Sequence, residues 1–226
     1  MSSPKLPVLE AERPRERLLR HGAAVLTDAE LLAVVLRTGT AGRPVVALAH
    51  DILEHFGGLR GLFAAGATPL GQVRGLGSAK ICQLLSILEL ARRALREDLA
   101  QTCALDQPAR VKQYCVALLG HREVEHCIAL YLDNRLRLIA TAEVARGTLS
   151  QASVYPREVV RDALRHHAAA LILAHNHPSG LALPSDADER LTRHLKQALA
   201  LVDVRLLDHL IVAGGAALSM AEQGRM

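Results

Sequence analysis

Apolar residues at helical spacing dominate the first part of the chain. A capping box at Thr27–Glu30 precedes apolar residues three and four positions apart, which predicts a helix. A second helix is predicted at about Val45–His55, before the pair Gly57-Gly58. Thr68-Pro69 has the residues of an N-cap and a first-turn proline, so another helix should begin there. The N-terminal region is therefore predicted to be all-helical.

A turn with two glycines, Gly75 and Gly77, precedes the next long apolar helical pattern. It resembles a helix-hairpin-helix, a module that often binds DNA. The glycines would let the turn approach a phosphate, and the N–H groups at the start of the next helix would attract it. Arg74 and Lys80 would add positive charge. A plain glycine turn between two packed helices explains the same residues, so both interpretations stay open.

The chain is interpreted as a helical domain at 1–104 and a second domain at 105–226. The helix after the glycine turn is predicted to end between Arg92 and Asp98. Residues from about Leu99 to Gln107 should then form a linker, and Pro108 opens the next element.

Helices and strands alternate irregularly in the second domain. Helices are predicted at Pro108–Leu119, after Pro156 and after Ser185. The predicted strands are, in chain order, Cys127–Leu132, Leu136–Ala145, a run around Leu171, and Leu206–Val212. This alternation predicts an α+β fold in which helices pack on a mixed sheet.

The candidate chemistry lies where the strand around Leu171 ends. His175 and His177 are two residues apart, so both imidazoles point to the same face of a strand. Ser185 and Asp188 follow at the start of the next helix, which would bring a carboxylate back to the histidines. Two His, one Asp and an open fourth position make up a catalytic zinc site. Ser185 and Asp188 also have the spacing of a capping pair, and one helix start can serve both purposes.

The spacing His-x-His, Ser, Asp is similar to the JAMM (MPN-type) metalloprotease motif. The segment Ala174–Gly180 resembles the RadC family in particular, and so do Gly147-Thr148, Tyr155–Val159 and Leu207–Val212. The resemblance extends from about residue 13 to the C-terminus. It implies a curved sheet between helices, and the RadC family is traditionally labelled a DNA repair protein.

The resemblance also implies a ligand set and a serine role. His175, His177 and Asp188 would hold Zn²⁺, which activates a water and polarises a substrate carbonyl. Ser185 would stabilise the oxyanion through its hydroxyl. Two His and one Asp suit several metals, so iron and manganese stay open beside zinc.

A glutamate upstream of the histidines would move the proton in this mechanism. Glu125 is the first choice, because residues 125–130 resemble the first strand of the family. Glu123 and Glu143 remain alternatives, because the geometry that selects a general base is not visible in a sequence.

Two other histidines lie near the motif in sequence, and a third lies farther along the chain. His166 and His167 are interpreted as residues at a helix C-terminus, where the helix dipole favours them. His209 follows Asp208 and is interpreted as a structural hydrogen-bonding residue, with support of a metal ligand as the alternative.

Three functions are compatible with these motifs. The first is a zinc-dependent peptidase or isopeptidase-like hydrolase, which the N-terminal region could recruit to DNA. The second is a metal-dependent enzyme acting on DNA or a nucleotide, and the third is a non-catalytic DNA- or partner-binding module with structural zinc. The loop Pro178–Pro184 contains no basic residue, which favours a peptide-like substrate over a phosphate-bearing one. The consecutive letters His-Asn-His are not the HNH nuclease motif, whose residues stand apart.

Composition indicates the type of core and limits what can be said about charged partners. The chain has 226 residues, half of them hydrophobic and only 2% aromatic, so its core is aliphatic. A net charge of +4 without a basic block permits nucleic-acid binding but does not require it. The four cysteines form no C-x-x-C pair, so they are interpreted as core residues.

No apolar stretch reaches the roughly 18 residues that cross a membrane, and the N-terminus has no apolar signal core. A cytoplasmic location is expected. The oligomeric state is not predicted.

Overall fold

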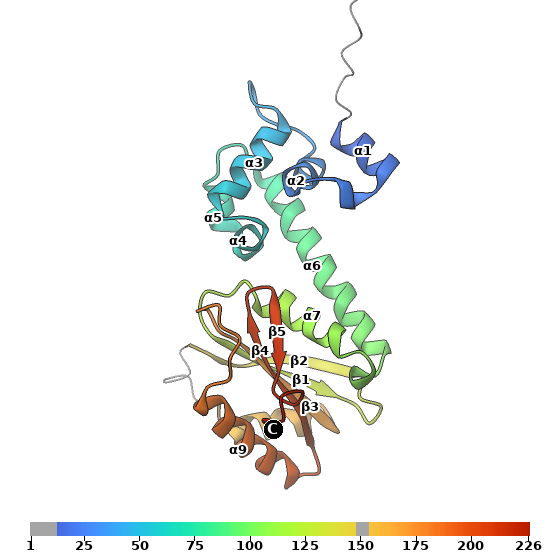
Figure 1. Cartoon of the computed structure of the whole chain (residues 1–226), viewed down its shortest axis with the longest axis vertical. Helices are drawn as coiled ribbons and strands as arrows, with labels where there is room; N and C mark the ends of the chain where they lie inside the picture. Colours follow the sequence, from blue (N-terminus) through green and yellow to red (C-terminus); the bar gives the residue numbers. More distant parts are fainter. Residues whose placement is uncertain (1–12, 148–153) are drawn as a thin grey trace, which may run out of the picture. The chain divides into compact units, whose positions relative to one another are not determined.

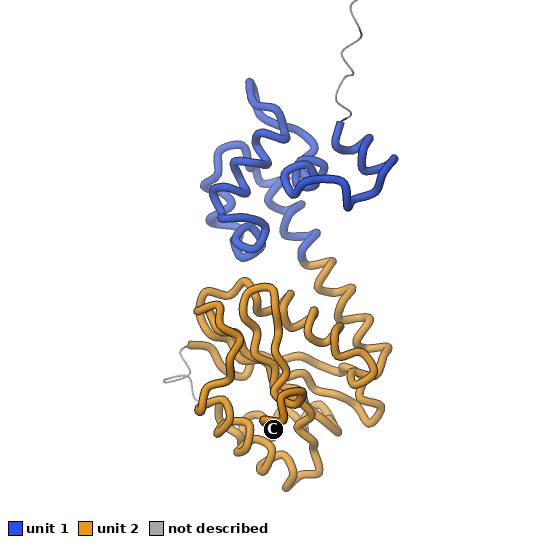
Figure 2. Tube along the Cα trace, in the orientation of Figure 1, with its two compact units in different colours: residues 1–88 blue, residues 89–226 orange. Residues whose placement is uncertain are grey.

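The computed structural model describes residues 13–147 and 154–226. The chain forms two compact units, Met1–Leu88 and Glu89–Met226, which Figure 2 colours separately. The division falls inside helix α6 (Ser78–Gln101), earlier than the boundary predicted between residues 104 and 105. The reason is that Leu95 and Leu99, in the last turns of α6, pack into the core of the second unit. The prediction that this helix ends before residue 99 is therefore wrong.

Helices make up the regular structure of the described part of the first unit (Figure 1). They are α1 (Pro14–His21), the short η1 (Ala23–Val25), α2 (Asp28–Leu36), α3 (Val45–His55), α4 (Leu59–Ala64), α5 (Ala67–Gly71) and the start of α6. The capping box is confirmed: Thr27 N donates to Glu30 Oε2 at 2.9 Å, and Thr27 Oγ1 accepts from Glu30 N at 3.3 Å. The predicted N-cap at Thr68 is wrong, because Gly66, two residues earlier, is the N-cap and α5 begins at Ala67.

The glycine turn between α5 and α6 is fixed by its surroundings. Gly75 has a φ of +100°, and a Cβ there would lie 2.7 Å from Thr40 Cγ2. Lys80 Nζ donates to the carbonyl oxygens of Thr38 at 2.6 Å and Gly75 at 3.2 Å. The Lys80 ammonium group therefore holds the turn against the loop after α2.

The second unit is built on one five-stranded sheet. Its elements after α6 are η2 (Ala104–Asp106), α7 (Pro108–Leu119), β1 (His126–Leu132), β2 (Leu138–Arg146), α8 (Pro156–Arg165), β3 (Ala170–Asn176), α9 (Asp186–Ala200), β4 (Arg205–Ala213) and β5 (Ala216–Ser219). The strand order is β2-β1-β3-β4-β5; β3 and β4 are parallel and the other neighbours are antiparallel. The sheet is mixed and helices pack on it, which confirms the α+β fold. No helix in the described ranges is both long and apolar enough to cross a membrane.

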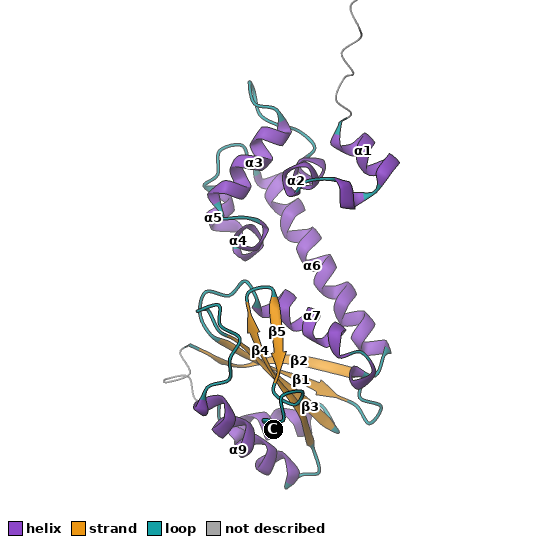
Figure 3. Cartoon of the chain, in the orientation of Figure 1, coloured by secondary structure: helices purple, strands orange, loops and turns teal. Residues whose placement is uncertain are grey.

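Residue parity decides which face of the sheet each side chain occupies. On β1 and β3 the even positions, such as Ile128 and Ile172, join the core formed with α7. The odd positions, such as Ala129 and Leu173, join the core formed with α8 and α9. Figure 3 shows α7 and α9 on opposite sides of the sheet. His175 is an odd residue of β3, so it belongs to the face that α9 covers.

Most predicted elements of this unit are confirmed, including α7 with the predicted bounds. The β1–β2 hairpin is confirmed, although β2 begins at Leu138 and not at Leu136. β5 was not predicted, because four residues beside a Gly-Gly pair carry too little of the period-2 pattern.

Candidate metal centre

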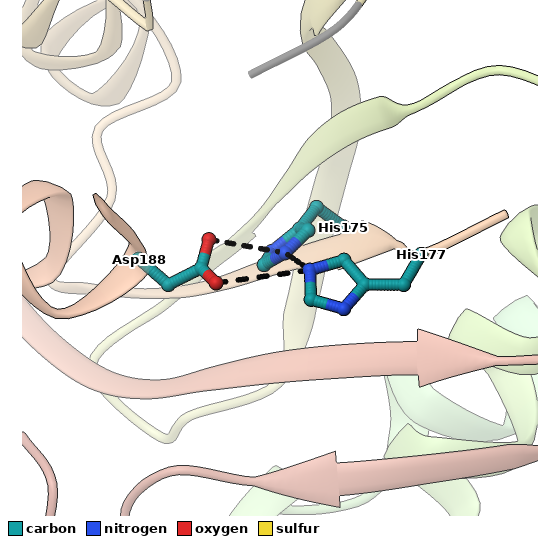
Figure 4. A group of neighbouring side chains, drawn as sticks. All are labelled: His175, His177 and Asp188. Atoms are coloured by element: carbon teal, nitrogen blue, oxygen red, sulfur yellow. Dashed lines mark hydrogen bonds and ion pairs between the residues drawn. The ribbon is translucent and has the colours of Figure 1, made fainter. Parts of the chain in front are cut away.

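His175, His177 and Asp188 come together at the end of β3 (Figure 4). His175 is the second-to-last residue of β3. His177 N donates to Val212 O at 2.8 Å, so the chain stays beside β4 beyond the end of the strand. Asp188 comes from the first turn of α9, where Ser185 is the N-cap. The predicted ligands therefore meet in space.

The spacing of the ligand atoms fits a metal ion. His175 Nε2 lies 2.8 Å from His177 Nε2 and 3.2 Å from Asp188 Oδ1, and His177 Nε2 lies 3.7 Å from Asp188 Oδ2. Ligands about 2.0–2.2 Å from a tetrahedral zinc are roughly 3.3–3.5 Å from one another. The three side chains could therefore surround one ion with small adjustments.

The site leaves one buried carboxylate oxygen without a hydrogen-bond donor among the described residues. Within the described residues, the buried Asp188 Oδ1 has no hydrogen-bond partner. His177 Nδ1 lies 2.9 Å from Leu181 O, which can only accept, so Nδ1 carries the proton and Nε2 a lone pair. A buried acceptor without a donor is costly, and a cation would remove that cost.

The ionisation of His175 and Asp188 suits metal binding. Burial lowers the pKa of His175 to about 4, which keeps its imidazole neutral at pH 7. Burial alone would raise the pKa of Asp188, but hydrogen bonds and charge from His177, His175 and Ser185 outweigh it and lower that pKa. The Asp188 carboxylate beside it raises the pKa of His177, so an incoming metal ion would displace a proton from this ring. A neutral imidazole and an ionised carboxylate are the forms that bind metals.

Ser185 takes part in the cap of α9 and not in a contact with the histidines. Its Oγ donates to Asp188 Oδ2 at 2.6 Å and accepts from Asp188 N at 3.2 Å. The cap and the candidate metal site thus share Asp188, as the sequence allowed. The oxyanion role of Ser185 stays a prediction that requires its hydroxyl to turn away from Asp188.

Glu125 lies immediately before β1, beside the metal group. Cys127 pairs with His175 in the antiparallel register of β1 and β3, so extending the register by two residues sets position 125 opposite His177. Asp188 and Leu181 O contribute more to the raised pKa of His177, and the charge of Glu125 adds to it. Glu125 therefore shares the face of the candidate ligands.

The other two candidate glutamates lie either on the opposite face of the sheet or farther from the strand end. Glu143 pairs with Ile128, which faces α7, and its Oε2 contacts His126 Nδ1 at 2.7 Å. It is thus on the face of the sheet opposite His175. Glu123 is exposed and two residues farther from the strand end. The geometry favours Glu125 over both.

Asn176 fixes the segment that carries Glu125, a role that sequence reasoning missed. Its Oδ1 accepts from His126 N at 2.8 Å, and its Nδ2 donates to Arg122 O at 3.2 Å and Val124 O at 3.0 Å. Asn176 stands between the two histidines, so one buried amide ties their strand to the chain just before β1. A polar residue at a buried strand position was the available signal.

Asn176→Asp should lower the free energy of unfolding by about 1–3 kcal/mol, because a carboxylate cannot donate to the two carbonyls and leaves them unsatisfied. Chemical denaturation of the metal-free protein measures this effect. Asn134→Asp, in the exposed turn after β1, is the matched control and should change stability by less than about 0.5 kcal/mol. Equal stability of the two variants would contradict the assignment.

Of the three other histidines considered in the sequence, two lie at the end of α8 and one contacts a candidate ligand. His166 is the C-cap of α8 and His167 follows it, as predicted. His209 lies within β4, fully buried, and contacts His175 Nδ1 through Nε2 at 2.8 Å and Thr192 Oγ1 through Nδ1 at 2.7 Å. Burial lowers the pKa of His209 to about 3. It therefore supports a candidate ligand, which is the alternative that the sequence left open.

The family follows from comparison with known proteins. A family model described as a RadC-like JAB domain matches residues 105–225, more than half of the chain. The chain belongs to the RadC family. A second model, described as the UPF0758 N-terminal region, matches residues 7–82. The RadC-like JAB domain supports a metal-dependent hydrolase-like fold for the second unit, and it contains all three candidate ligands.

Curated RadC relatives match along nearly their whole length. A UPF0758 protein of Bordetella bronchiseptica is 64% identical over 226 residues, covering 100% of both chains. A UPF0758 protein of Nitrosospira multiformis is 58% identical over 95% of this chain and 96% of its own. One of Herminiimonas arsenicoxydans is 55% identical, with 96% and 97% coverage. The designation UPF0758 names no reaction.

Proposed function

We propose that this RadC protein is a zinc-dependent hydrolase of peptide or isopeptide bonds. The observation that carries the proposal is the group of His175, His177 and Asp188. It offers three ligand atoms, one of them a buried carboxylate oxygen without a hydrogen-bond partner in the described part of the chain. Structural zinc usually has four protein ligands, whereas catalytic zinc has three and an open position. Bound zinc would polarise a substrate carbonyl and lower the pKa of a water molecule.

Two side chains near the three ligands would transfer the proton of the attacking water and stabilise the negative charge on the substrate. Glu125, beside His177, would accept a proton from the attacking water on its carboxylate and deliver it to the leaving amine. Ser185 would donate a hydrogen bond from its hydroxyl to the developing oxyanion once that hydroxyl turns away from Asp188.

The loop beside the ligands favours an amide substrate. Residues 178–184 carry no charge, and Leu181 and Leu183 are 64% and 65% exposed. An uncharged loop with exposed leucines could contact an extended peptide, whereas a phosphate-directed site would be expected to present Lys or Arg.

The direct test is hydrolysis by the full-length zinc-loaded protein. A set of fluorogenic peptides, a lysine ε-amide isopeptide, and single- and double-stranded DNA would be incubated with it. We expect cleavage of an amide substrate that a chelator abolishes and added zinc restores. Chelator-sensitive cleavage of DNA with no amide cleavage would instead support the nucleic-acid-processing alternative.

We also propose that the first unit can bind DNA through the turn between α5 and α6. Arg74 in this turn is exposed, and no carboxylate in the described ranges pairs with it. Lys80 is engaged with backbone carbonyls and is a weaker candidate for phosphate binding than the sequence indicated. Binding would act through phosphates and have little sequence specificity.

Arg74→Glu should weaken binding of duplex DNA roughly 3- to 10-fold at low salt, because one phosphate contact becomes repulsive. Fluorescence anisotropy measures the affinity, and Arg135→Glu, in an exposed turn of the second unit, is the charge-matched control. Gly77→Ala is the suitable turn variant, since Gly75→Ala would strain the backbone and clash with Thr40. Absence of DNA binding by the wild type at low salt would remove the proposal.

A further inference from the structure

We propose that Thr192 and His209 are positioning residues that set the tautomer of His175 and aim its Nε2 lone pair at the metal. This inference rests on the metal site of the proposed function but concerns residues outside the ligand set. It assigns a purpose to two buried polar side chains that the hydrolase motif does not include.

The two residues form a continuous chain of short contacts behind the site. Thr192 Oγ1 lies 2.6 Å from Asp188 O and 2.7 Å from His209 Nδ1. His209 Nε2 lies 2.8 Å from His175 Nδ1. The side chains come from α9, β4 and β3, and Thr192 and His209 are both fully buried. This series of hydrogen bonds therefore joins the backbone of one candidate ligand, Asp188, to the ring of another, His175.

The chemistry at one end of this chain fixes the direction of every hydrogen bond in it. A carbonyl oxygen can only accept, so the single hydroxyl proton of Thr192 is used on Asp188 O. Thr192 Oγ1 must then accept from His209 Nδ1, which carries the ring proton. Complete burial favours the neutral imidazole, which has one N–H, so His209 Nε2 is an acceptor.

The consequence reaches the metal site through His175. Since His209 Nε2 accepts, His175 Nδ1 must donate to it, and His175 Nε2 is left with a lone pair. That atom faces Asp188 Oδ1 at 3.2 Å, within the candidate ligand group. If Thr192 donated to His209 instead, each ring would reverse and a proton on His175 Nε2 would occupy the metal position.

This arrangement also explains why the site could bind a cation without a change of histidine tautomer. In its neutral form His177 donates from Nδ1 to Leu181 O, so its Nε2, like that of His175, carries a lone pair. A partner on the far nitrogen of a ligating histidine fixes the ring orientation and raises its basicity. Here that partner is a second histidine, which is itself held by a threonine.

The hydroxyl of Thr192 is tested by a pair of variants. Thr192→Val keeps the shape but removes the acceptor for His209 Nδ1–H, whereas Thr192→Ser keeps the hydroxyl. We expect zinc affinity, measured by competition with a chelating dye, to fall about 10- to 100-fold in Thr192→Val and less than about threefold in Thr192→Ser. Thr141→Val removes a hydroxyl that contacts Tyr114 on the other face of the sheet, and it should leave zinc affinity unchanged.

Histidine ¹⁵N NMR of the metal-free protein provides a readout that does not depend on zinc. In the wild type we expect His175 and His209 both to be in the Nδ1–H form, with that form partly lost in Thr192→Val. His175 found as the Nε2–H form, or equal zinc affinity in the Val and Ser variants, would overturn the inference. A wild type that shows the expected tautomers but binds no zinc would count against the proposed function while the hydrogen-bond chain stands.

Discussion

His177→Ala is expected to purify almost free of zinc, whereas the wild type carries close to one ion per chain. Loss of a partner behind a ligand already costs about 10- to 100-fold in affinity, so loss of the ligand itself should cost more than about 100-fold. The effect should be specific, because His177 is at the end of the strand and contributes its Nε2 to the ligand group and its Nδ1 to Leu181 O. Metal analysis of both proteins by mass spectrometry measures the difference, and it also identifies the metal.

His194→Ala is the matched control for this prediction. His194 is exposed on α9, the same helix that carries Asp188, so its loss removes an imidazole without touching the ligand group. It should retain zinc at the wild-type level. A wild type without metal after zinc is added back, or a His177→Ala protein with wild-type zinc, would contradict the assignment.

The positions of the ligands could be predicted from the sequence because each depends on a local rule. Residues two apart on a strand share a face, which puts His175 beside His177. A capping box starts a helix, which fixes Ser185 and Asp188 relative to each other. Neither rule requires knowledge of the rest of the fold.

The supporting residues could not be predicted in the same way, because their partners are far away in sequence. Asn176 bonds to a segment 50 or more residues earlier, and His209 meets His175 across 34 positions. Their roles depend on the register of β1 with β3 and of β3 with β4. The end of α6 was missed for a related reason: the burial of Leu99 depends on the core of the second unit.

The candidate glutamates show how the fold separates residues that look equivalent in sequence. Glu123, Glu125 and Glu143 are the three candidates, and spacing alone does not rank them. The pairing of Glu143 with Ile128 sends it to the α7 face, while the pairing of Cys127 with His175 sets Glu125 on the metal face. One register thus separates two candidates on the same sheet.

Glu125→Gln is therefore expected to keep its zinc and lose about 10²- to 10⁴-fold in the rate of amide hydrolysis. The amide of glutamine has nearly the same shape as the carboxylate but cannot accept the proton from water. Zinc binding should therefore persist while amide hydrolysis is lost. Zinc content and kcat are measured on the same preparation. Glu143→Gln and Glu123→Gln are the matched controls, and both should retain most of the wild-type rate.

Activity of the three variants distinguishes a wrong general base from a wrong register of β1 with β3. If Glu143→Gln lost the rate and Glu125→Gln did not, the proton would have to pass around the edge of the sheet from the α7 face, and the register argument would be wrong. If all three variants were active, the hydrolysis would need no carboxylate from this group. Loss in Glu125→Gln alone, with zinc retained, would tie the chemistry to the side chain that the β1–β3 register sets opposite His177.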